Sequence, residues 1–198
     1  MNTTYTYQPH ILEETCRGLE CYDLRDEMLN NRELELTGPV DTDSVSVLIR
    51  SLLYLQKKDS KSPITLYINS PGGEVSSGLA LYDTMQAVTC PIRTVCVGSA
   101  ASMAAILFIA GNQRDMLPHS RVMIHDPLIQ GNGITGNALN VYSKAEDLMR
   151  VRKITAEIIA RHTGMDIEKV FTLTAHDTYF EAEEAVKAGL ADHIIHSF

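Results

Sequence analysis

The chain has 198 residues, of which 44% are hydrophobic and 21% charged, a composition typical of a globular protein with a sizeable core. Its 17 basic and 25 acidic residues give a net charge of −8 without a basic block, which disfavours binding to nucleic acid. The longest apolar run, residues 100–110, is too short to span a membrane, and the N-terminus lacks a secretory signal pattern. We expect a cytoplasmic protein with one domain over residues 1–198, bound to neither membrane nor nucleic acid.

The cysteines and the C-terminal histidines suggest no metal site. The four cysteines form no CxxC pair, and we interpret them as reduced and partly buried; they are Cys16, Cys21, Cys90 and Cys96. His193 and His196 lie close together near the C-terminus, but a zinc site needs more ligands than these two. We therefore expect no metal.

The first part of the chain alternates between helix and strand patterns. A helix is predicted to start at residues 41–44 and to end before a polar loop over 57–63. A short strand over 64–68 follows and stops at the turn 69–73, after which a second helix begins. The apolar stripes of these two helices are Val45, Leu48, Leu52 and Leu55, and then Val75, Leu79, Tyr82 and Met85.

The second part continues the alternation. A strand is predicted over 93–97, a turn at Gly98 and a buried helix within 100–110, followed by a strand over 121–124. A long helix then runs to a cap at Gly164, with an apolar stripe of Val141, Ala145, Leu148, Val151, Ile154 and Ile158. Strands that alternate with helices predict an α/β fold with mostly parallel pairing.

Ser102 is the first candidate for chemistry. It lies where a strand leads through small residues into a buried helix, whose N-terminal amides and dipole could stabilise an oxyanion. The alternative, and the commoner role for such a serine, is that it only caps the helix. The Ser-Pro-Gly-Gly turn over 70–73 either presents free N–H groups to a ligand or is a plain strand-to-helix turn.

His125 ends an apolar strand, where it is either a general base or a structural histidine. A serine nucleophile needs such a base, and the base needs an acidic partner. Asp126 is adjacent and therefore points to the opposite face of the strand. Asp166 follows a helix end and resembles a cap, which leaves Asp177 and Asp192 as candidates that spacing does not separate.

The segment 131–136 matches the G-x-G-x-x-G pattern of dinucleotide sites, with a strand before it and a helix after it. However, that helix is long, and no second strand ends in an acidic residue at the expected distance. A glycine loop is the preferred interpretation.

Taken together, the segments resemble the ClpP family, the proteolytic subunits of Clp proteases, over about residues 11–195. The matching segments are 67–73 (YINSPGG), 81–86 (LYDTMQ), 100–103 (AASM), 120–125 (SRVMIH) and 184–192 (EAVKAGLAD). The resemblance implies a crotonase-like fold of ββα units, with a protruding handle strand and helix over about 126–164.

The resemblance also implies the roles of single residues. Ser102 would be the nucleophile, His125 the base and Asp177 the acid of a serine endopeptidase. The amides of Gly73 and Met103 would form the oxyanion hole. No cofactor is implied for this chain, because ATP is used by a partner unfoldase.

The implied assembly is a barrel of two stacked heptameric rings, fed with unfolded polypeptides by a AAA+ Clp unfoldase. Residues from about 1 to 17 would form the axial entrance, and part of them is a candidate propeptide. A subunit that is active or docked only in a mixed ring with a second ClpP-like chain is the alternative. A crotonase-type enzyme acting on a CoA thioester is a third reading, against which the Ser102 turn argues.

The sequence departs from the family pattern in several places. Asp126 replaces the usual Gln, and 129–130 replace a Gly-Gly pair in the handle. Ala175 and His176 replace an acidic residue and an Arg at the ring-to-ring contact, which predicts a weaker, pH-dependent double ring. The unfoldase-docking pocket is altered as well. It keeps Tyr67 and Leu117, but aromatic residues are replaced by Thr65, Ala87 and Asp115, which predicts poor docking. The Asp115 carboxylate is expected to face the apolar anchor of the unfoldase.

Overall fold

The computed structural model describes residues 9–129 and 135–198. Most of the glycine-rich segment 131–136, and the first half of the segment expected at the axial entrance, therefore lie outside the described residues.

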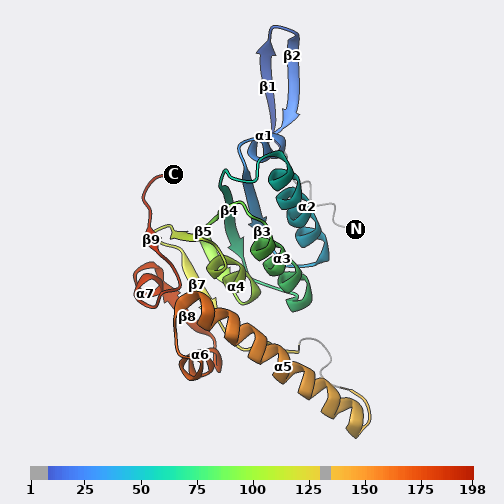
Figure 1. Ribbon diagram of the computed structural model, residues 1–198, viewed down its shortest axis with the longest axis vertical. Coiled ribbons are helices and arrows are strands. Elements are labelled where there is room, and N and C mark those ends of the chain that lie inside the picture. Colours follow the sequence, from blue (N-terminus) through green and yellow to red (C-terminus); the bar gives the residue numbers. More distant parts are fainter. Residues whose placement is uncertain (1–8, 130–134) are drawn as a thin grey trace.

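A seven-stranded sheet forms the centre of the molecule (Figure 1). Five parallel strands lie side by side in the order β3 (Glu33–Thr37), β4 (Ile64–Ser70), β5 (Ile92–Ala101), β6 (Gln113–Met116) and β9 (His193–Ile194). β7 (Arg121–Ile124) is parallel to the last residues of β5, and β8 (Thr178–Glu181) is antiparallel to β7. The prediction of an α/β fold with mostly parallel strands is confirmed.

Helices connect the strands along the chain. They are α1 (Leu24–Asn30), α2 (Thr42–Lys58), α3 (Val75–Ala87), α4 (Met103–Ile109), α5 (Ala138–Thr163), α6 (Ile167–Thr174) and α7 (Ala182–Lys187). A separate hairpin of β1 (His10–Thr15) and β2 (Gly18–Asp23) projects from one end of the molecule, and α5 projects from the other (Figure 1).

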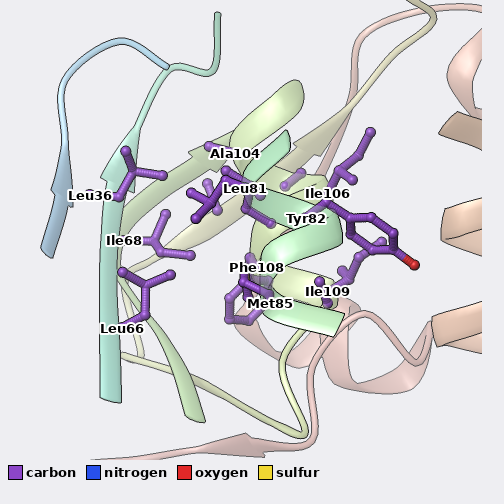
Figure 2. Close-up of a cluster of buried hydrophobic side chains, with 14 of the residues drawn as sticks. Leu36, Leu66, Ile68, Leu81, Tyr82, Met85, Ala104, Ile106, Phe108 and Ile109 are labelled. Atoms are coloured by element: carbon purple, nitrogen blue, oxygen red, sulfur yellow. The ribbon is translucent and has the colours of Figure 1, made fainter. Parts of the chain in front are cut away.

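The core lies between the sheet and the helices that follow its strands. Figure 2 shows Leu66 and Ile68 of β4 facing Leu81 and Met85 of α3, with Phe108 of α4 between them. The predicted stripe of α2 is buried over its whole length. The helix begins at Thr42, within the predicted start, and Asp41 is its N-cap: the Asp41 carboxylate accepts the N–H of Ser44 at 2.8 Å.

β5 is longer than predicted. The turn expected at Gly98 is wrong, because the strand continues to Ala101 by pairing its last three residues, Ser99–Ala101, with Arg121–Met123 of β7. α4 therefore starts at Met103, directly after Ser102. This extension places Ser102 beside the end of β7.

The long helix α5 ends at Gly164 as predicted, where a left-handed φ of 73° favours glycine. Its predicted apolar stripe is wrong as a description of core packing. Ile158 is buried, but Val141, Ala145 and Ile154 are exposed. Val141 and Ala145 lie in the first half of the helix, which extends beyond the sheet (Figure 1). The helical part of the expected handle is thus present, while residues 125–129 and 135–137 form no strand.

The cysteines divide into two groups. All four are free; Cys90 and Cys96 are buried as predicted, whereas Cys16 and Cys21 are exposed because they belong to the projecting hairpin. Among the helices in the described parts of the chain, none combines the length and the apolar character needed to cross a membrane.

Candidate active site

Ser102 occupies a sharp turn between β5 and α4. Its backbone has φ 54° and ψ −123°, a conformation that residues with a side chain rarely adopt. The Ser102 N–H donates to the carbonyl of Met123 at 2.8 Å, which anchors the turn to β7. The side chain makes no capping hydrogen bond, so the interpretation of Ser102 as a simple helix cap is wrong.

Instead, the Ser102 hydroxyl contacts His125. The distance from Ser102 Oγ to His125 Nε2 is 2.7 Å. The other ring nitrogen of His125, Nδ1, lies 3.2 Å from Asp177 Oδ1. The His125 side chain is 14% exposed, whereas that of Asp177 is 59% exposed.

Strand pairing explains why these residues meet. Ala101 pairs with Met123 across β5 and β7, so the residues that follow each of them are brought close together. Ile124 pairs with Thr178 across the antiparallel β7 and β8, so His125 and Asp177 flank the same end of that ladder. The sheet therefore assembles the three side chains from three separate segments.

The arrangement has the geometry of nucleophilic catalysis. With the proton of a neutral His125 on Nδ1, this nitrogen donates to Asp177, and Nε2 is free to accept the proton of the Ser102 hydroxyl. A nucleophile within reach of a base, and a base oriented by an acid, define this type of site.

The other candidate acids are engaged elsewhere. Asp126 lies beyond the end of β7, so the strand argument does not apply to it, and its carboxylate binds Arg152 Nε at 2.5 Å. Asp166 is the N-cap of α6, as predicted, and accepts the N–H of Glu168 at 2.9 Å. Asp192 is paired with the guanidinium of Arg114. Asp177 is thus the acid that the structure brings to His125.

The Ser-Pro-Gly-Gly turn lies directly against Ser102. Gly72 has φ 87°, and a Cβ at this position would lie 2.5 Å from the Ala101 carbonyl oxygen and 3.0 Å from the Met103 nitrogen. Only glycine fits such a close approach. The sequence pattern marks the turn as a whole and does not distinguish Gly72 within it.

Gly73 is held by the neighbouring loop. Val40 N–H donates to the Gly72 carbonyl at 2.9 Å, and Glu74 N–H donates to the Val40 carbonyl at 2.7 Å. These bonds do not use the Gly73 N–H, and no described residue accepts a hydrogen bond from the N–H of Gly73 or Met103. Among residues 9–129 and 135–198, both amides are therefore without a hydrogen-bond acceptor.

A sequence model of a known family, described as Clp protease, matches residues 16–198. The chain belongs to the Clp protease family. The family consists of ClpP-type serine peptidases, and its crotonase-like α/β fold agrees with the sheet and helices seen here. Membership of this family does not support the alternative of a crotonase-type enzyme that acts on a CoA thioester.

The residues expected to line a docking pocket lie on β4 and β6, at the end of α3 and directly after β6. Thr65 and Tyr67 of β4 lie on the side of the sheet opposite to the buried Leu66 and Ile68. Asp115 lies on the same side, because Tyr67 and Asp115 both pair with Val95 of β5. The last residue of α3, Ala87, is exposed, and Leu117 follows β6 and is half-buried.

Asp115 is not an open carboxylate. Its side chain is 0% exposed and binds Arg93 Nε at 2.6 Å, Gln113 Nε2 at 2.9 Å and His193 Nδ1 at 3.3 Å. The expectation that this carboxylate faces an apolar anchor is therefore wrong, since partners from three strands already surround it. Arg93 and His193 were not recognised from the sequence, because an alternating strand pattern does not show which neighbours a charge will have.

Tyr67 is also engaged within the chain. Its hydroxyl donates to Glu33 at 3.1 Å, and its ring meets the C-terminal Phe198 edge-on, with 5.6 Å between the ring centres. Burial, together with the charge of Glu33, raises the pKa of Tyr67. No pattern in the sequence indicates this contact of Phe198.

Ala175 and His176 form the link between α6 and Asp177. Ala175 is the C-cap of α6, and both residues are exposed. Their side chains are therefore accessible at the surface next to the candidate active site.

Within residues 9–129 and 135–198, no three His, Cys, Asp or Glu side chains are placed to hold one metal ion.

Proposed function

We propose that this chain is the proteolytic subunit of a Clp protease, a serine endopeptidase with Ser102, His125 and Asp177 as its catalytic residues. The observation that carries this proposal is the 2.7 Å contact between Ser102 Oγ and His125 Nε2 at a strained turn. Strained turns that expose a reactive side chain are typical of catalytic nucleophiles.

In the proposed reaction, Ser102 Oγ attacks the carbonyl carbon of a peptide bond while His125 Nε2 takes the hydroxyl proton. The negative charge that develops on the carbonyl oxygen is stabilised by the N–H groups of Gly73 and Met103. His125 then gives its proton to the leaving amine, which leaves an acyl group on Ser102. Water, deprotonated by His125, releases the acyl group as a carboxylic acid. Asp177 holds the imidazole in one tautomer and stabilises its charged form.

The proposed substrates are unfolded polypeptides and short peptides, cleaved inside two stacked heptameric rings. Several large apolar residues are exposed on the projecting half of α5, among them Leu139 at 78% and Tyr142 at 63%. They support assembly, because larger exposed apolar patches mark interaction surfaces. The proposed partner is a AAA+ Clp unfoldase, which consumes the ATP.

A second candidate is a subunit that docks its unfoldase only in a ring containing another ClpP-like chain. The specific observation in its favour is the ion pair of Asp115 with Arg93, with His193 beside it, where the family has an apolar pocket. Apolar anchors gain most of their binding energy in dry, apolar pockets. A pull-down with a Clp unfoldase, comparing the wild type with Thr65→Tyr/Ala87→Phe, tests this. We expect weak binding by the wild type and tighter binding by the variant; tight binding by the wild type alone would contradict the second candidate.

The experiment that tests the main proposal is turnover of short fluorogenic peptides. Ser102→Ala and His125→Ala should each reduce turnover on the order of 10³-fold or more. Unchanged turnover in Ser102→Ala would contradict the proposed roles, and a wild type without peptidase activity would favour the mixed ring.

Sedimentation between about pH 5.5 and 8 tests the proposed weak ring-to-ring contact at His176. A double ring that is unchanged over this range and on dilution would contradict it.

A further inference from the structure

Arg152 of α5 connects the two segments that carry His125 and Asp177. Its Nε donates to Asp126 Oδ2 at 2.5 Å, and Asp126 is the residue after His125. Its Nη2 donates to the carbonyl of Phe171 at 3.4 Å, and its guanidinium carbon lies 4.3 Å from the centre of the Phe171 ring. Phe171 belongs to α6, the helix that leads to Asp177. The Arg152 side chain thus contacts both the residue after His125 and the helix that precedes Asp177.

Backbone contacts bring the same two segments together. Asp126 N–H donates to the carbonyl of Thr174 at 2.6 Å, at the last residue of α6. The Thr178 hydroxyl donates to the carbonyl of Leu173 at 2.6 Å, across the link 175–177. This link is therefore held at both ends, and its position depends on where α6 lies relative to the residue after His125.

The sheet alone does not fix this geometry. The last pair of the β7–β8 ladder is Ile124 with Thr178, so His125 and Asp177 lie one residue beyond it. The Arg152 and Asp126 side chains are 25% and 29% exposed, which keeps their ion pair partly shielded from water. Charge-assisted hydrogen bonds are stronger than neutral ones, and a planar guanidinium holds several partners at fixed angles.

We propose that Arg152 is a positioning residue for the proposed catalytic site. Through Asp126 it fixes the segment of His125, and through Phe171 it fixes the segment of Asp177, so that the 3.2 Å contact between them is maintained. The inference rests on the proposed function of Ser102, His125 and Asp177. Arg152 touches none of these three side chains and acts only through its two neighbours.

The test is steady-state turnover of a short peptide by the full-length protein. Arg152→Gln removes the charge and should lower kcat about tenfold or more, because small displacements of catalytic groups are costly. KM should stay within about twofold of the wild type, since Arg152 is not among the groups that would bind substrate. Arg152→Lys, which keeps the charge near Asp126, should retain more of kcat than Arg152→Gln.

Arg150→Gln is the matched control. Arg150 lies on the same helix, is 73% exposed and pairs with Asp147 of that helix. The substitution removes the same charge without disturbing β7 or α6, so kcat should remain at the wild-type value. An equal loss in both variants would overturn the inference, because it would reflect α5 or the net charge in general.

Asp126→Asn removes the charge of the other partner in this contact. Because the substitution is nearly isosteric, the variant is expected to fold. If both residues act through one contact, the double variant Asp126→Asn/Arg152→Gln should lose no more kcat than the worse single variant. Multiplied losses, or an Arg152→Gln kcat within about twofold of the wild type, would overturn the positioning role. Turnover that persists in Ser102→Ala would instead overturn the proposed function itself.

Discussion

Ser102 and His125 are 23 residues apart in the chain, yet Ser102 Oγ lies 2.7 Å from His125 Nε2. The parallel pairing of β5 with β7 creates this proximity, because the Ser102 N–H donates to the carbonyl of Met123. The contact therefore depends on the unpredicted extension of β5 beyond Gly98. The strained backbone of Ser102 ends that strand and turns the hydroxyl towards the imidazole.

Replacing the acid should slow the reaction without stopping it. Asp177→Asn keeps the shape of the side chain but removes the acceptor that selects the reactive tautomer of His125. We expect peptide turnover to fall about 10²-fold or more, yet less than in Ser102→Ala, because Asp177 is 59% exposed and water can partly replace it. Asp192→Asn is the control: it weakens the pair with Arg114 and should leave turnover of the folded protein unchanged. Equal losses in the two variants would argue against the role of Asp177.

Substitutions at two glycines with similar φ angles, Gly72 and Gly164, should have different effects. Gly164→Ala meets nothing within 4 Å at φ 73°, so it should cost about 1 kcal/mol of unfolding free energy and leave turnover intact. Gly72→Ala would place a Cβ 2.5 Å from the Ala101 carbonyl, so the turn must move and carry the Gly73 amide with it. We expect turnover to be lost in the protein that remains folded. Urea unfolding and peptide turnover measure the two effects, and full activity in Gly72→Ala would contradict the account of this turn.

The repeating patterns of this sequence predicted the central elements but not their partners. The stripe of α2 is buried as expected, whereas the equally regular stripe of α5 is largely exposed, since periodicity shows a face and not what covers it. Asp177 was identified only through the family resemblance, because its contact with His125 depends on the four-residue strand β8, which carries little pattern of its own. The burial of Asp115 likewise depends on the pairing of β6 with β9, far along the chain.

Removing one partner of the buried ion pair should be costly. Asp115→Leu leaves the Arg93 guanidinium, in a side chain 28% exposed, without its carboxylate, and we expect a loss of about 3 kcal/mol of unfolding free energy. The double variant Arg93→Ile/Asp115→Leu removes both charges and should recover most of that loss. Urea unfolding of the single and double variants decides the point. A double variant that is as unstable as Asp115→Leu would show that the unpaired Arg93 charge does not cause the loss of unfolding free energy.

His162 should make stability depend on pH. Burial, with the nearby charges of Arg114 and Arg161, lowers the pKa of His162, and Tyr82 Oη lies 3.0 Å from its Nε2. As the pH falls through the ordinary histidine range, the unfolded chain therefore takes up a proton at this residue while the folded chain does not. The contribution of His162 to stability thus falls as the pH decreases. Between about pH 7.5 and 5.5, His162→Gln should lose less unfolding free energy than the wild type. An identical pH dependence in the His162 variant and the wild type would contradict this explanation.

The measurement that tests the central claim most directly is labelling with a fluorophosphonate, which reacts with serines that a neighbouring base has activated. The 2.7 Å contact with His125 predicts that Ser102 is such a serine. Intact mass and peptide mapping of the labelled protein should show one modification per chain, on Ser102, with none in Ser102→Ala and a much slower reaction in His125→Ala. Labelling at another serine, or equal labelling of the wild type and Ser102→Ala, would contradict the account.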